Sequence, residues 1–153
     1  MGIALGIATL SGLLASTRLM SKMLVSPLAG FLSDILGRYR ASLFSFFGMI
    51  LSMTLLSLTH SILAILIISL TFILSNFLEV VLATEVADLA ASQDKARELI
   101  ISLYVNWMDL GLAIGPLIAY LLRVKIEFQK IYLGAALTLL LTAILHLYTM
   151  KER

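Results

Sequence analysis

The sequence has 153 residues, of which 61% are hydrophobic and 13% are charged. One soluble core cannot bury so large a hydrophobic fraction at this length, so the composition predicts an integral membrane protein. The 11 basic and 9 acidic residues give a net charge of +2 without a basic stripe, which excludes a nucleic-acid partner. Cysteine is absent and only 2 histidines occur, so we expect no disulfide, no metal site and no cofactor.

Five apolar stretches are long enough to cross a hydrocarbon core about 30 Å thick, which takes about 20 helical residues. They predict an all-α protein with five transmembrane helices in a lipid bilayer. We expect spans near residues 11–33, 41–59, 62–84, 99–122 and 131–150, all in a single domain over 1–153. Residues 1–10 are expected to form a connecting or interfacial stub, and the polar stretch after residue 84 is expected to extend the third helix into water.

The first span carries Arg18 and Lys22, which share one helix face because they are four residues apart. Inside a membrane these cations repel each other unless an acid or an anionic solute lies between them, so one interpretation is a cationic notch for a carboxylate or phosphate. The other is that Arg18 extends to the outer headgroups and Lys22 pairs within the bundle. Lys22 lies about 18 Å along the helix from Asp34, near the middle of the membrane.

A polar turn follows, with Gly30, Asp34, Gly37, Arg38 and Arg40 in that order. Glycines permit a tight turn between two spanning helices, and the charged residues keep that turn in water. Asp34 either caps the N-terminus of a neighbouring helix, where the helix dipole favours an anion, or is simply solvated.

The third and fourth spans also carry ionisable groups. Glu79 is expected near the inner edge of the third span, as a solvated, a helix-pairing or a proton-coupling carboxylate. Asn106 and Asp109 are expected to face a polar interior, because ionisable groups in membranes usually do. Asp109 lies about 16 Å from Glu98, at the depth of Lys22, so these two can pair. The second span carries no charge and the fifth only a histidine, so both are expected at the periphery.

The polar turn resembles the signature loop of the major facilitator superfamily, which joins the second and third or the eighth and ninth of twelve helices. Seven residues match that loop: Gly30, Leu32, Ser33, Asp34, Gly37, Arg38 and Leu43. Ile35 and Tyr39 stand where the family usually has basic residues, which weakens any charge relay through the loop. A second stretch, 104–116, looks like the eleventh helix of such transporters.

This resemblance implies secondary transport of a small solute by alternating access. The five spans then correspond to the eighth through twelfth helices, so the chain is a partial half-bundle and a fragment of a twelve-helix carrier. Its N-terminal half would be missing or replaced by a partner chain. The substrate or ion pathway would be lined by Arg18, Lys22, Glu79, Asn106 and Asp109. The charged turn would act as a gating loop, in which Asp34 stabilises one gating state.

Orientation follows from the basic residues, because positive loops stay in the cytoplasm. One side holds Arg38, Arg40, Lys95, Arg97, Lys151 and Arg153, and the other holds Arg123, Lys125 and Lys130. The larger group predicts that the C-terminus is cytoplasmic, in a plasma or inner membrane.

Gly111 and Gly115 form a face of small residues that lets another helix approach closely, and Pro116 weakens the backbone hydrogen bonding beside it. A hinge and a simple packing contact both explain this pattern. If the face binds another chain, the protein is a non-transporting membrane interaction protein, which is the alternative hypothesis. An enzyme is not expected, because no nucleophile motif or metal-ligand spacing occurs.

Overall fold

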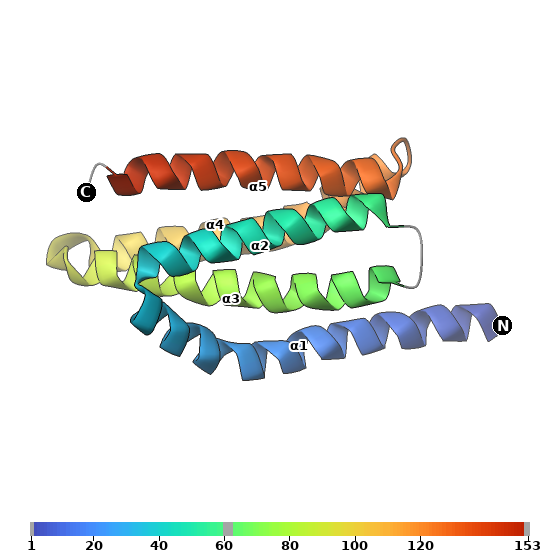
Figure 1. Ribbon diagram of the computed structural model, residues 1–153, viewed down its shortest axis with the longest axis horizontal. Helices are drawn as coiled ribbons and strands as arrows, with labels where there is room; N and C mark the ends of the chain where they lie inside the picture. The colour runs from blue at the N-terminus through green and yellow to red at the C-terminus, as the bar shows by residue number, and fades with distance from the viewer. Residues whose placement is uncertain (1, 60–62, 152–153) are drawn as a thin grey trace.

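A computed structural model shows five long helices that run side by side (Figure 1). It describes residues 2–59 and 63–151. Within these residues the elements are α1 (Gly2–Leu36), α2 (Arg38–Leu58), α3 (Leu63–Ala91), the short 3₁₀ helix η1 (Asp94–Ala96), α4 (Arg97–Arg123) and α5 (Phe128–Lys151). Each of the five long helices contains a stretch long and apolar enough to cross a membrane. The predicted all-helical class with five candidate spans is therefore confirmed.

The helix ends differ from the prediction in two places. α1 is continuous from Gly2, so residues 2–10 belong to the helix and are not a separate stub; its membrane-length part is Ala15–Leu36. α1 contains Pro27 and bends along its length (Figure 1), since an internal proline removes a backbone hydrogen bond. α3 continues beyond residue 84 to Ala91, as expected from its polar end. The hairpin predicted at His60 and Ser61 lies outside the described residues.

A single residue, Gly37, separates α1 from α2. Its φ is 84°, and no other described residue has a positive φ. This backbone conformation is strained for a residue with a Cβ atom, so glycine at this position allows the chain to reverse within one residue. The Ala41 amide donates a hydrogen bond to the Gly37 carbonyl at 3.1 Å, which begins α2.

The second helix is the most buried part of the bundle. The neighbouring helices bury 39% of the membrane-length stretch of α2, against 22% for α3 and 0% for α4. α2 thus packs most closely with its neighbours, while its expected place outside the polar interior stays a prediction. Small residues allow the close approach: Ser45 and Ser52 are buried and donate to carbonyls of their own helix. At Gly48 an added Cβ would lie 3.0 Å from Leu74 of α3.

The packing is uneven around this centre. α2 packs mainly on α3 and α5, where Phe46, Met49, Leu78 and Ala143 form a hydrophobic core. α1 and α4 each pack on α3 and do not contact one another within the described residues. α3 therefore forms the floor of an open face between α1 and α4, which we call the α1–α4 face.

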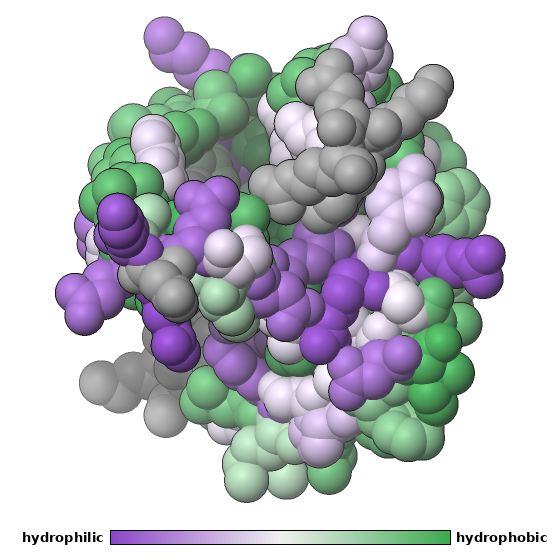
Figure 2. Space-filling view, turned by 90° about the vertical axis from the view of Figure 1, so that its left-hand side faces the viewer, coloured by the Kyte–Doolittle hydropathy of each residue, from purple (hydrophilic) through white to green (hydrophobic). Residues whose placement is uncertain are grey.

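Charged residues gather at one end of the bundle, which we call the Gly37 end. It carries the Gly37 turn, the α3–α4 connection and the last turns of α5 (Figure 1). Figure 2 looks onto this end: hydrophilic side chains run across the middle of the view, and hydrophobic ones lie mainly above and below them. A polar end on an apolar bundle is the pattern that a membrane requires, since charges there stay in the aqueous layer.

We expect Gly37→Ala to lower the stability of the bundle by about 1 kcal/mol, because a Cβ is strained at this φ. The measurement is thermal unfolding in detergent, followed by circular dichroism. Gly30→Ala is the matched control, since its added Cβ would meet no atom within 4 Å and its φ is not positive. An equal loss of stability in both variants would show that the turn conformation is not what requires glycine.

Candidate functional site

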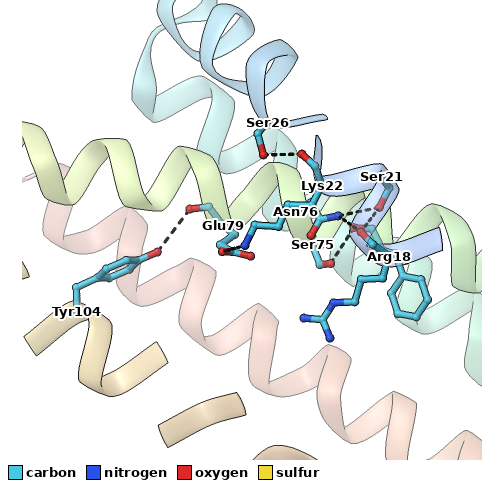
Figure 3. Close-up of polar contacts among 9 residues, drawn as sticks. Arg18, Ser21, Lys22, Ser26, Ser75, Asn76, Glu79 and Tyr104 are labelled. Atoms are coloured by element: carbon cyan, nitrogen blue, oxygen red, sulfur yellow. Dashed lines mark hydrogen bonds and ion pairs between the residues drawn. The ribbon is translucent and has the colours of Figure 1, made fainter. Parts of the chain in front are cut away.

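An ion pair inside the membrane region joins α1 to α3. Nζ of Lys22 lies 2.6 Å from Oε1 of Glu79 (Figure 3). The side chains are 49% and 31% exposed, so the pair borders the open α1–α4 face instead of being sealed within the bundle. The suggested pair between Lys22 and Asp109 is not formed, because the ammonium group of Lys22 pairs with the Glu79 carboxylate.

The position of Glu79 along α3 follows from the helix bounds. α3 has 29 residues, and Glu79 lies near its middle, while its place near the inner edge of the membrane span stays a prediction. The carboxylate is nine residues, or about 14 Å, from Asp88 at the Gly37 end, while Lys22 is about 18 Å from Asp34. Both groups of the pair thus lie about half the thickness of a 30 Å hydrocarbon core from these charged residues at the Gly37 end.

The fourth helix reaches the same site through Tyr104. Its hydroxyl donates a long hydrogen bond, 3.5 Å, to the backbone carbonyl of Glu79 (Figure 3). Three helices therefore meet at Glu79: α1 through Lys22, α3 itself and α4 through Tyr104. This convergence makes the pair a junction of the bundle.

Arg18 and Lys22 differ in their surroundings although they share a helix face. In Figure 3 Lys22 extends toward Glu79, while the guanidinium of Arg18 lies apart from that pair. Arg18 is exposed, and no carboxylate of a described residue forms an ion pair with it. Its backbone carbonyl accepts a hydrogen bond from Nδ2 of Asn76 at 3.3 Å, and the same amide donates to Oγ of Ser21 at 2.8 Å.

Asn76 is a polar residue of this region that the sequence analysis missed. It is only 2% exposed and holds the backbone of α1 against α3 one turn from Lys22. The sequence feature that could have identified it is an amide side chain within the apolar run of α3, three residues before Glu79. A buried amide in a membrane helix requires hydrogen-bond partners, so it indicates a helix contact.

The remaining predicted pathway residues lie apart from the pair. Asn106 and Asp109 are exposed on α4, and neither forms a hydrogen bond or an ion pair with another described side chain. Gly111, Gly115 and Pro116 are also exposed, and a Cβ at either glycine would meet no atom within 4 Å. α4 nevertheless remains one helix through Pro116. No described helix packs closely against the small-residue face.

At the Gly37 end, Arg38 holds three helices together. It begins α2, and its guanidinium lies 2.7 Å from Oδ1 of Asp34 on α1 and 3.0 Å from Oδ2 of Asp88 on α3. It also donates to Oγ of Ser33 at 3.2 Å. Asp34 therefore pairs with Arg38 and does not cap α2, whose first turn lacks a side-chain cap. Arg40 is exposed and takes no part in this cluster.

Asp88 was likewise not singled out from the sequence. The sequence feature that could have identified Asp88 is the acidic continuation of α3, which places a carboxylate at the water-exposed end of that helix. Its partner is on another helix, so only the fold shows the contact. Among the described residues, no three His, Cys, Asp or Glu side chains form a group that could hold a metal ion.

The geometry of the turn and of the spans agrees with the comparison of the whole sequence with models of known protein families. The family model of the Major Facilitator Superfamily matches residues 2–153. The chain belongs to the major facilitator superfamily. Its members are membrane transporters, so the predicted family and the general class of transporter are confirmed. No curated protein and no solved structure matches the chain.

In this superfamily member, we expect the contributions of the Lys22 and Glu79 charges to the unfolding free energy to depend on each other. Glu79→Gln alone leaves an unpaired ammonium near the membrane centre, which we expect to lower the unfolding free energy by roughly 2 kcal/mol. The double variant Lys22→Met with Glu79→Gln removes both charges and should recover most of that loss. Unfolding in detergent, with each variant compared to wild type, measures this coupling.

The control is the pair Glu127 and Lys130, whose side chains lie 3.6 Å apart and are about 70% exposed. Neutralising Glu127 alone should change stability little, because exposed ion pairs contribute little. If the single and double variants at Lys22 and Glu79 lose equal stability, the two charges are not coupled.

Proposed function

We propose that the chain forms one wall of a carrier that moves a small solute by alternating access, with the α1–α4 face as the solute pathway. The observation that carries this proposal is the half-exposed ion pair of Lys22 and Glu79 near the membrane centre. Charges at that depth are costly and usually mark a substrate or ion path. In transporters of this kind, binding sites lie near the membrane midplane, where two structural halves meet.

The substrate class that fits best is a small anion carrying a carboxylate or phosphate. Glu79 neutralises Lys22, so Arg18 is the cation on this face that stays available to a solute. A guanidinium binds planar and tetrahedral oxyanions through paired hydrogen bonds. We assign Asp109 on α4 to the solute or to a coupling ion, because within the described residues α4 does not contact α1, which leaves space for a solute between the two helices.

A second wall completes this pathway, supplied by an N-terminal half or by a partner chain. The support is α4, which has no buried residue although it carries Asn106 and Asp109. We place the Gly37 end and the C-terminus in the cytoplasm of a plasma or inner membrane, because this end holds more of the basic residues. Arg38, by tying Asp34 and Asp88, then stabilises one gating state at the cytoplasmic end.

The alternative function is a membrane interaction protein that does not transport. The exposed Gly111 and Gly115 favour it, because a small-residue face without a neighbour can receive a helix of another chain. A partner that copurifies in fixed ratio, together with no solute flux in proteoliposomes, would support this alternative and contradict transport.

Uptake into proteoliposomes that contain the complete carrier, with both walls present, tests the transport proposal, with radiolabelled phosphate and succinate as probes. We expect Arg18→Gln to reduce anion uptake at least tenfold, because it removes the available cation. Arg123→Gln is the control: Arg123 lies at the other end of α4, over the ring of Phe128 at 4.4 Å, and its loss should leave uptake unchanged. Uptake of neutral or cationic solutes alone would contradict the anion class.

Asp109→Asn separates transport from membrane insertion. This variant keeps the shape of the side chain but loses its charge, so we expect uptake to be abolished while the amount of inserted protein stays at the wild-type level. An immunoblot of washed membranes measures insertion beside the uptake assay. Wild-type uptake by this variant would remove Asp109 from the mechanism.

A further inference from the structure

A groove lies between α4 and α5, on a part of the bundle that the proposed solute pathway does not use. These two helices follow one another in the chain but pack little against each other, and α4 joins the bundle mainly through α3. The groove between them has a volume of about 590 Å³. Both helices are long and apolar enough to cross a membrane, so the groove opens into hydrocarbon. We call it the α4–α5 groove.

Small residues make the α4–α5 groove deep. Gly115 lines it from α4, and Gly134 and Thr138 line it from α5, one turn apart on the same helix face. A Cβ added at either glycine would meet no atom of the described chain within 4 Å. The Thr138 hydroxyl donates to the Ala135 carbonyl at 2.8 Å, so it is already satisfied within its own helix. The groove beyond Lys130 is therefore apolar.

The length of the groove matches one leaflet of a bilayer. On α5 its lining residues run from Lys130 to Thr138, which is eight residues or about 12 Å. On α4 they run from Gly115 to Leu122, which is about 10 Å. One leaflet contributes about 15 Å to a hydrocarbon core about 30 Å thick, whereas a spanning helix needs the whole thickness. The groove thus fits an acyl chain of one leaflet better than it fits another transmembrane helix.

The end of the groove away from the Gly37 end is basic. Lys130 lines it there, and the stretch 123–130 holds three basic residues and one acid, Glu127. Nζ of Lys130 lies 3.6 Å from Oε2 of Glu127, and both side chains are about 70% exposed. Such an exposed pair contributes little, so the ammonium group is available to a phosphate.

The same end carries the marks of a membrane surface. The guanidinium of Arg123, the last residue of α4, lies over the ring of Phe128 at 4.4 Å. Aromatic rings and basic side chains at the ends of spanning helices are typical of the headgroup level. Lys130 lies two residues after Phe128 on α5, and the apolar part of the groove begins directly beside it. A cation at headgroup level above an apolar groove is the arrangement that fits an anionic lipid.

We propose that the α4–α5 groove binds one anionic phospholipid, with an acyl chain along the groove and its phosphate on Lys130. The acyl chain supplies dispersion contacts that α4, which has no buried residue, does not receive from the described helices. The bound lipid thereby connects α4 to α5 where the two helices pack little against each other. This proposal goes beyond transport and holds whichever solute the protein moves.

Native mass spectrometry of the full chain in detergent tests this site. The probes are phosphatidylglycerol, which is anionic, and phosphatidylcholine with the same acyl chains, which has no net charge. We expect the wild type to retain one phosphatidylglycerol about tenfold more tightly, because only this lipid brings a net negative charge to Lys130. Lys130→Gln should bring the two affinities to within about twofold, because it removes that difference in charge. Gly134→Leu should weaken both lipids by about tenfold or more, because leucine occupies the place of the acyl chain.

Two matched variants serve as controls. Gly12→Leu makes the same substitution on α1, where an added Cβ likewise meets no atom within 4 Å, and Lys95→Gln removes an exposed cation at the Gly37 end. Both should bind phosphatidylglycerol as the wild type does. Wild-type affinity in Gly134→Leu, or equal affinity of the wild type for the two lipids, would overturn the proposal. A lipid-free dimer that Gly134→Leu turns into a monomer would also overturn it, because a helix of a second copy would then fill the groove.

Discussion

Hydrocarbon penalises any charge that lacks a partner, and this constraint shapes the whole bundle. Lys22 and Glu79 meet at 2.6 Å and so fix α1 against α3. Asn76 secures the same two helices one turn away, and Tyr104 brings α4 to the same point. The pair stays half exposed, so it stabilises the fold while still bordering the α1–α4 face. One ion pair thus links the packing of three helices to the proposed pathway.

The rest of the architecture keeps this junction in place. α2 is buried through small residues and forms the centre on which α3 and α5 pack. At the Gly37 end, Arg38 joins α2 to α1 and α3, and Gly37 itself allows the reversal of the chain. Fixed contacts therefore lie at the Gly37 end and along α2, whereas α4, with no buried residue, is the helix most open to a second wall.

The sequence was sufficient for the features that depend on local pattern. Apolar length predicted five helices, and the glycine and charge spacing of the turn predicted both the Gly37 reversal and the family. Contacts between helices could not be predicted in the same way. The pairing of Lys22 with Glu79 depends on how α1 packs on α3, and Arg38 pairs with Asp88, which lies 50 positions farther along the chain. His146 remained unassigned because its partners lie on two other helices.

The most direct test of the account is whether the α1–α4 face contacts water in the membrane. The chain has no native cysteine, so single cysteines can be introduced without background. Asn106→Cys on α4 should react with a membrane-impermeant methanethiosulfonate in intact membranes, because we propose that Asn106 lines an aqueous pathway. Leu141→Cys on α5, which is 62% exposed but apolar in its surroundings, should remain unlabelled in lipid. Equal protection of both cysteines would contradict an aqueous pathway along this face.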